Sequence, residues 1–227
     1  MKKIFLSMIL FFVAFFSLFS IDFSTGVGLK ITPYTEQIEI SAERYKSAYV
    51  SYDWVDWSAY AFFDAQYVEF DIGYYRALYG SYSQSSFGAP LDLETQYGDL
   101  NISYLDLSLM LKYPIKIKTG AIIPLIGFSY RINLTSDYGY TSYKGDVPKK
   151  DWNQMWIKTG VNYDHNITSK IFARTVFTLC FPIKTPAWGE KCQDLYDIFA
   201  PSIPGVKTTF GGIGCELSIA LGYRINN

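Results

Sequence analysis

The sequence is poor in the residues that carry catalysis or bind metals. Its 227 residues include three Cys and one His. Cys180, Cys192 and Cys215 are too dispersed for a metal motif, and no Cys stands early enough to attach a lipid after a signal segment. The single His165 enters a predicted short turn, where a His is normally solvated and not paired with a nucleophile. We therefore expect no catalytic residue, no metal and no cofactor, and a protein that is not an enzyme.

Charge is also scarce. Charged residues make up 18% of the chain and the net charge is -1. This balance excludes a basic surface for nucleic acid and an acidic tail. No stretch beyond Ile21 is long and apolar enough for a helix to span a bilayer. What the chain does have is aromatic residues, 19% of the total with 20 Tyr, on a length that fits one domain.

The N-terminus has the pattern of a secretory signal. Lys2 and Lys3 precede an uncharged apolar run from Ile4 to Ile21. The small Ser20 marks the predicted cleavage site, which divides the chain into a signal peptide, 1–20, and a barrel domain, 21–227. The alternative is a retained transmembrane anchor, because the run is close to spanning length.

The segment Gly211–Ile225 alternates between two kinds of residue, which predicts a strand with two environments. One face is apolar and consists of Ile213, Cys215, Leu217, Ile219, Leu221, Tyr223 and Ile225. The other is small and polar and consists of Gly212, Gly214, Glu216, Ser218, Ala220, Gly222 and Arg224. Small polar side chains suit a narrow, crowded lumen. The apolar face then looks outward and requires lipid.

Seven further segments have a strand pattern: Asp22–Thr32, Trp57–Ala65, Tyr67–Tyr79, Leu100–Lys112, Ile122–Leu134, Gln154–Asp164 and Lys170–Phe181. Short connections alternate with long ones, and the long ones are Pro33–Asp56, Gly80–Asp99, Thr135–Asn153 and Pro182–Phe210. An even strand count with this alternation is typical of outer-membrane barrels, whereas a soluble β-sandwich has no reason for it. The predicted fold is all-β, an eight-stranded antiparallel up-and-down transmembrane β-barrel with long outer loops and short periplasmic turns.

This fold predicts where the ends and the aromatic residues lie. Both termini fall on the periplasmic side of the bacterial outer membrane, and the long loops are extracellular. Trp54, Trp57, Trp152 and Trp156 lie in or beside these loops, so we expect them in the outer aromatic girdle. Simple loop packing is the alternative for any one of them.

Several segments resemble a known family. Phe62–Glu69 is similar to a tight periplasmic hairpin, and Pro124–Tyr130 and Trp156–Asp164 resemble pieces of small spirochaete outer-membrane barrels. The closing Ala220–Ile225 resembles the terminal signal strand of a barrel. The resemblance implies two partners, the lipid bilayer of the outer membrane and the barrel-assembly machinery. The chain departs from the family pattern at its end, where Ile225 stands near the place of the usual terminal aromatic residue.

Charged residues of both signs, in near balance, fall on the predicted inward faces: Lys30, Glu69, Asp71, Asp106, Lys112, Arg131, Asp164, Arg174, Glu216 and Arg224. The interior of an eight-stranded barrel is just wide enough for side chains to fill, and an unpaired buried charge is costly. We therefore expect a mostly paired network that plugs the barrel midway. The alternative is a narrow conduit lined by charge.

Three functions remain open from the sequence. The outer loops bind an external ligand or host molecule that the sequence does not identify; the barrel passes small apolar or amphipathic solutes; or the protein is a soluble secreted barrel with an apolar ligand inside. The first is favoured because long Tyr-rich loops stand on a rigid scaffold. The face assignments also predict that Cys180 points inward and Cys215 outward, so that these two do not form a disulfide.

Overall fold

The computed structural model describes residues 22–42, 45–86, 89–96, 101–137, 153–184 and 207–225. The predicted signal peptide, 1–20, and Trp152 lie outside these ranges. The strands are β1 (Phe23–Ala42), β2 (Tyr45–Ala65), β3 (Val68–Ser86), β4 (Ala89–Gln96), β5 (Asn101–Lys112), β6 (Ile115–Ile117), β7 (Gly120–Asp137), β8 (Gln154–Asn166), β9 (Ile171–Lys184) and β10 (Lys207–Arg224). The described ranges contain no helix of the length and apolarity needed to cross a membrane.

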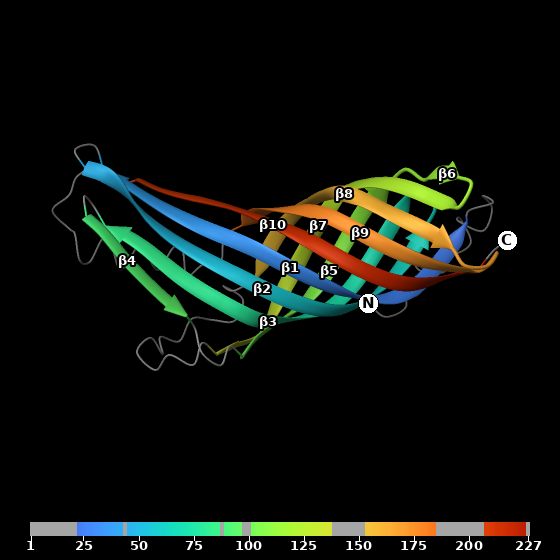
Figure 1. Cartoon of the computed structure of the whole chain (residues 1–227), viewed down its shortest axis with the longest axis horizontal. Coiled ribbons are helices and arrows are strands. Elements are labelled where there is room, and N and C mark those ends of the chain that lie inside the picture. Colours follow the sequence, from blue (N-terminus) through green and yellow to red (C-terminus); the bar gives the residue numbers. More distant parts are fainter. Residues whose placement is uncertain are drawn as a thin grey trace, which may run out of the picture.

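Eight of these strands form a closed barrel (Figure 1). Their order around the wall is β2, β1, β10, β9, β8, β7, β5 and β3, and β3 pairs with β2 to close the ring. Every pairing is antiparallel. The two short strands are additions: β4 pairs with β3 and β6 with β7. The predicted eight-stranded antiparallel barrel is confirmed.

The register of the strands determines how narrow the barrel is. Directly opposed residues follow one another around the wall from Ser24 through Asp64, Glu69, Met110, Gly127, Lys158, Cys180 and Gly214 back to Tyr34. The circuit returns to β1 ten residues away from its start (34 minus 24), so the shear is 10. With eight strands at normal spacing, this shear tilts the strands by about 41° from the barrel axis. Such a barrel has an interior that side chains fill.

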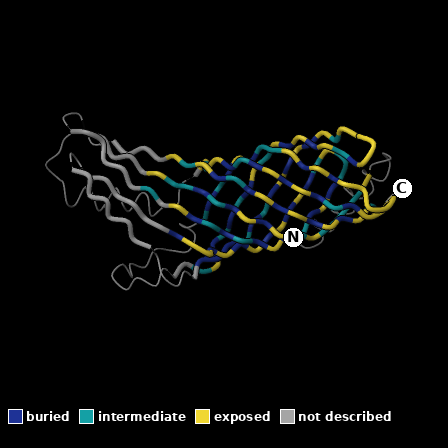
Figure 2. Tube along the Cα trace, viewed as in Figure 1, coloured by how far each residue is buried: buried dark blue, intermediate teal, exposed yellow. Residues whose placement is uncertain are grey.

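The two faces of the wall differ along every barrel strand, as the alternating colours of Figure 2 show. On β10, Leu217, Ile219 and Leu221 are 52–65% exposed on the outer face. On the inner face of the same strand, Glu216 and Ser218 are buried. The face assignment predicted for this strand is therefore confirmed, with apolar side chains outside and small or polar side chains inside.

One end of the barrel has short connections and is called the turn end. Gln66 and Tyr67 join β2 to β3, and Gln66 adopts a left-handed backbone conformation with φ of 46°, which a turn this tight requires. Residues 113–119, which include β6, join β5 to β7, and residues 167–170 join β8 to β9. Both ends of the barrel domain meet here, because Ser24 of β1 pairs with Arg224 of β10.

At the opposite end the structure corrects two predicted loops. Pro33–Asp56 is not a loop: β1 continues to Ala42 and β2 begins at Tyr45. Gly80–Asp99 likewise contains the end of β3 and all of β4. Pro33 was expected to end its strand, but the pairing of β1 with β10 is interrupted at Thr32 and Pro33, where the missing N–H is not needed. The predicted loops Thr135–Asn153 and Pro182–Phe210 fall mostly outside the described residues.

These longer strands make the barrel wall uneven. On one side β10, β1, β2 and β3, with β4, extend well past the tops of β5, β7, β8 and β9 (Figure 1). We call this extension the projecting sheet and its end of the barrel the projecting end. Among the described residues, the wall thus continues as an open sheet on one side.

Candidate functional site: the filled lumen

The interior of the barrel holds charged side chains that cross the lumen and pair. Seven carboxylates and five cations, all buried, form eleven ion pairs. They divide into two groups. The turn-end cluster is Asp64, Glu69, Lys112, Asp164 and Arg174. The central cluster is Lys30, Asp56, Asp71, Asp106, Arg131, Lys158 and Glu216.

Arg174 organises the turn-end cluster. Arg174 lies on β9, and its Nε and Nη2 donate to the two carboxylate oxygens of Asp164 at 2.7 and 2.8 Å. Its Nη1 donates to Glu69 Oε2 at 2.6 Å, and Nη2 also reaches Asp64 Oδ2 at 2.8 Å. Lys112 on β5 pairs with both Asp64 and Glu69. One guanidinium therefore ties β9 to β8, β2 and β3, and closes the lumen at this level.

An aromatic layer lies against the same guanidinium. The Arg174 Cζ lies 4.3 Å from the ring centre of Phe62 and 5.3 Å from that of Phe172, both fully buried. Glycines make room for these rings: a Cβ on Gly222 would lie 2.2 Å from the Phe172 ring, and one on Gly26 would lie 2.5 Å from the Phe62 ring. Two rings and one cation thus fill the width of the barrel at the level where glycines on the wall leave room for them.

The central cluster is a chain of ion pairs across the middle of the barrel. Lys30 Nζ lies 3.0 Å from Asp71 Oδ2 and 3.2 Å from Glu216 Oε1. The other oxygen of Glu216 lies 3.1 Å from Lys158 Nζ, which is 3.4 Å from Asp106 Oδ2. Each lysine therefore bridges two carboxylates, and β1, β3, β5, β8 and β10 are linked through the lumen.

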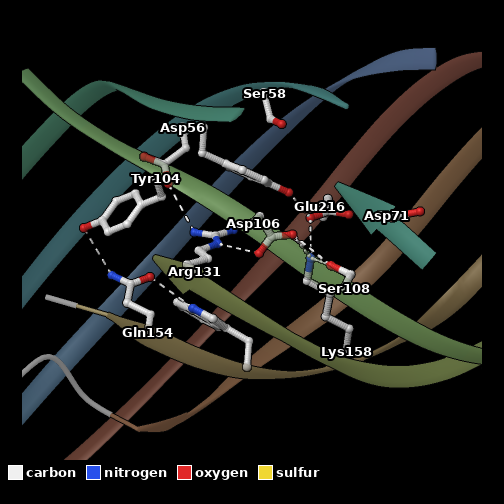
Figure 3. Close-up of polar contacts among 12 residues, drawn as sticks. Asp56, Ser58, Asp71, Tyr104, Asp106, Ser108, Arg131, Gln154, Lys158 and Glu216 are labelled. Atoms are coloured by element: carbon white, nitrogen blue, oxygen red, sulfur yellow. Dashed lines mark hydrogen bonds and ion pairs between the residues drawn. The ribbon is translucent and has the colours of Figure 1, made fainter. Parts of the chain in front are cut away.

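Arg131 forms the end of this chain toward the projecting end. Its Nη1 lies 3.3 Å from Asp56 Oδ2 and its Nε lies 3.6 Å from Asp106 Oδ1 (Figure 3). Its Cζ lies 4.3, 5.2 and 5.8 Å from the ring centres of Tyr75, Trp156 and Tyr34. Arg131 is therefore held as much by aromatic faces as by carboxylates.

One residue predicted for the network lies elsewhere. Arg224 is only half-buried at the turn end, where Nη2 donates to Asn166 Oδ1 at 2.6 Å and Nη1 to the carbonyl of Ser169 at 3.3 Å. It packs against Phe172, with Cζ 4.8 Å from the ring centre. The prediction was wrong because Arg224 is too near the end of its strand to reach the carboxylates above the aromatic layer.

Three members of the clusters were missed. Asp56, Asp64 and Lys158 are all buried and paired. Asp56 was assigned to a loop, and the run of aromatic residues around Asp64 obscured the two faces of that strand. Strand alternation held the signal for all three, because each lies an even number of residues from another inward side chain.

Two of the Trp residues predicted for the outer girdle lie inside. Trp54 is 5% exposed and Trp156 is 1% exposed, whereas Trp57 is half-buried on the outer face. Trp156 donates from Nε1 to Gln154 Oε1 at 3.0 Å within the lumen. The girdle prediction was wrong for Trp54 and Trp156 because even-numbered positions of β2 and β8 face inward.

The two described cysteines are free thiols. Cys180 is fully buried on the inner face opposite Gly214, while the neighbouring Cys215, opposite Leu179, is half-buried on the outer face. The predicted absence of a Cys180–Cys215 disulfide is confirmed, because the two side chains lie on opposite faces. His165 is exposed at the turn end, 3.3 Å from the Tyr163 hydroxyl. Within the described ranges, no group of three His, Cys, Asp or Glu side chains is placed to hold a metal ion.

Comparisons with known proteins give weak likenesses to barrels. No family model matches the chain, and no curated protein matches it. The N-terminal β-barrel domain of Pseudomonas aeruginosa OprF is 11% identical, with 87% of this chain and 97% of that chain covered and a TM-score of 0.37. Neisserial surface protein A is 10% identical, with 86% and 96% covered and a TM-score of 0.38. The Escherichia coli outer membrane protease OmpT is 10% identical, with 90% and 97% covered and a TM-score of 0.36. We therefore take the function from this chain's own residues.

Proposed function

We propose that the protein is an outer-membrane barrel with a blocked lumen that holds the projecting sheet outside the cell to bind a partner. The role is one of binding, without catalysis. The observation that carries it is the set of buried ion pairs that crosses the lumen at two levels. A barrel closed in this way serves as an anchor.

The outer apolar band supports the membrane location. On β1 the outward positions from Phe23 to Pro33 are apolar except for Thr25, and Val27 is 64% exposed. The ten residue steps from Phe23 to Pro33 rise about 25 Å along the barrel axis at the strand tilt given above. The apolar band of outer-membrane barrels is also about 25 Å tall. Directly above it the outer face turns polar, with Thr35 bonded to Asp53 at 2.6 Å.

The unequal ends support an orientation. In outer-membrane barrels the short turns face the periplasm and the longer connections face outside. The turn end, with both ends of the barrel domain, is then periplasmic, and the projecting sheet is extracellular. The barrel-assembly machinery would insert the protein, and the outer-membrane lipid would surround it.

The membrane location is tested with Ile219, which is 65% exposed on the outer face. Ile219→Arg should destabilise the barrel by about 2–4 kcal/mol if the side chain is at mid-bilayer depth. Ile219→Val is the matched control. The unmodified protein should require detergent and migrate faster on gels unheated than boiled. A detergent-free, monodisperse monomer would exclude the membrane location.

Two experiments test the anchor role: recording of conductance through the barrel and shortening of the β1–β2 hairpin. In planar bilayers the unmodified protein should show little or no steady conductance, and large stable open channels would contradict a blocked lumen. For the second experiment, a variant replaces residues 37–51 of the β1–β2 hairpin with a two-residue turn. In nanodiscs it should keep the fold and lose binding to a panel of extracellular proteins and surface polysaccharides. Unchanged binding after trimming would move the binding surface elsewhere.

A second candidate function is sideways passage of small apolar or amphipathic solutes through the wall. It is favoured by the seam between β9 and β10, whose pairing ends at Cys180 and Gly214 although β9 continues to Lys184. Pro182, which has no N–H to donate, lies on this seam close to Gly212. Pro182→Ala should reduce entry of a fluorescent fatty acid into liposomes that contain the protein. Entry no faster than in empty liposomes would remove this candidate.

A further inference from the structure

A small cavity lies where the two ion-pair clusters meet. Its volume is about 10 Å³, and its lining includes Glu69 of the turn-end cluster and Asp71 of the central cluster. The remaining charged side chains around it are Lys30, Lys158 and Glu216. On this measure a cavity of about 10–15 Å³ holds one water molecule. The space between the clusters is therefore the size of a single water.

Two of the side chains that line this cavity carry unbonded polar atoms. Asn162 on β8 is completely buried, and neither its Nδ2 nor its Oδ1 has a hydrogen-bond partner among the described residues. Asp71 on β3 is 6% exposed, and its Oδ1 also lacks a partner there, although Oδ2 bonds Lys30. A buried polar atom without a hydrogen bond destabilises the fold. Three such atoms on one cavity therefore indicate an occupant that both donates and accepts.

We propose that one ordered water molecule occupies this cavity and joins Asp71 of the central cluster to Asn162 of β8. A water can donate one hydrogen to Asp71 Oδ1 and one to Asn162 Oδ1, and it can accept from a neighbouring donor such as Asn162 Nδ2. This meets the usual number of about three hydrogen bonds for a buried water. The water bridges β3 and β8 at the level where the two clusters meet. This proposal goes beyond the anchor function, and it holds whatever the projecting sheet binds.

The mixed charges around the cavity favour a neutral occupant over an ion. Two ammonium groups, of Lys30 and Lys158, line it and would repel a cation at this short range. Three carboxylates, of Glu69, Asp71 and Glu216, line it too and would repel an anion. A neutral dipole fits both sets at once, because it turns its hydrogens to the oxygens and its oxygen to the donors.

Asn162→Leu distinguishes a wet cavity from a dry one by the sign of the stability change. Leu has the same number of non-hydrogen side-chain atoms as Asn but no polar atoms. If the cavity is dry, the substitution removes two unbonded polar atoms and should raise the thermal midpoint. If it holds water, the water loses its Asn162 partners and Asp71 loses the water, and the midpoint should fall by about 3 °C. A fall supports the proposal and a rise overturns it.

The matched control is Thr32→Val. Thr32 is 1% exposed with an unbonded Oγ1 among the described residues, but it is not part of the cavity lining. The shift in thermal midpoint of this variant shows the effect of removing an unbonded polar atom elsewhere in the same lumen. The difference between the two variants in the change of thermal midpoint measures the contribution of the water.

A direct observation keeps the proposal testable if Asn162→Leu does not fold. A high-resolution crystal structure of the unmodified protein should show a density peak within hydrogen-bond distance of Asp71 Oδ1 and of the Asn162 amide. An empty cavity overturns the proposal. Anomalous signal at this place after rubidium soaking also overturns it, because it identifies a cation.

Discussion

The two halves of the lumen use arginine in opposite ways. At the turn end, every guanidinium nitrogen of Arg174 donates at least one short hydrogen bond. Toward the projecting end, Arg131 makes one long hydrogen bond, and its Nε and Nη2 have no hydrogen-bond partner within the described chain. Aromatic rings surround it instead. The first half is held by many directional bonds at once, and the second by stacking, which is less demanding in geometry.

The largest expected effect comes from cutting the turn-end cluster. The double variant Arg174→Met with Asp164→Leu removes one cation and one carboxylate, but it leaves Asp64 and Glu69 with Lys112 alone. Removal of one partner from a buried ionic group costs about 3–5 kcal/mol. We expect a loss of this size in the free energy of unfolding, measured by urea titration in detergent micelles.

The control for that loss is Arg224→Ala. This arginine lies outside the cluster, and its hydrogen bonds to Asn166 and the Ser169 carbonyl are exposed, so its loss should cost about 1 kcal/mol or less. Equal losses for the two changes would mean that the turn-end cluster adds nothing beyond a surface contact.

The glycines give the next contrast. Gly222→Ala places a Cβ against the Phe172 ring, whereas a Cβ on Gly211 would meet nothing within 4 Å. Overpacking in a filled interior costs about 1–3 kcal/mol. Gly222→Ala should therefore lower the unfolding midpoint in urea clearly, and Gly211→Ala on the same strand should leave it nearly unchanged. Tolerance of Ala at both positions would show that the turn end is not tightly filled.

A smaller effect is expected at Arg131. Arg131→Met with Asp56→Leu removes a cation and its own carboxylate together, and Asp106 keeps Lys158 and the Ser108 hydroxyl. Replacing a whole buried pair with apolar side chains is often neutral. The stability should stay within about 1 kcal/mol of the unmodified protein by the same urea titration. A loss as large as that of the Arg174 variant would remove the difference between the two halves.

The cysteines report the inner and outer faces with almost no change in stability. In a Cys192→Ser background, Cys215 on the outer face should react with a small membrane-permeant maleimide. Cys180, which is completely buried, should react only after unfolding. Mass spectrometry of the labelled peptides measures both. Rapid labelling of Cys180 in the folded protein would indicate an open lumen.

Strand alternation made most of the fold predictable from the sequence. The apolar face of Gly211–Ile225, the even number of strands and the short turns are all local patterns. The extent of β1 and β2 was not predictable in the same way. Beyond Pro33 the pattern is less regular, and these residues are strands because nearly all of them pair with the other arm of the hairpin.

The site was predictable as a set of inward charges but not as pairs. Lys30 meets Asp71 and Glu216 only because the register brings β1, β3 and β10 to one level. Register depends on pairing between distant segments, which a single strand does not specify. The cavity beside Asn162 depends on the same register. For Trp54 and Trp156 the residue type was misleading. It suggested the outer girdle, whereas the alternation along β2 and β8 places both side chains on the inner face.

The ladder between β1 and β10 sets the order in which the chain can fold. It joins Ser24 to Arg224, residues 200 apart in the sequence (224 minus 24), whereas the other seams of the barrel join neighbours along the chain. Contacts between residues so far apart in the sequence form late, because the entropic cost of closing the long loop between them must be overcome first. Until then β1 and β10 are free edges, which template aggregation. A circular permutant that links the two ends and opens the chain between Gln66 and Tyr67 would make this ladder a local hairpin, and it should refold with a different rate-limiting step.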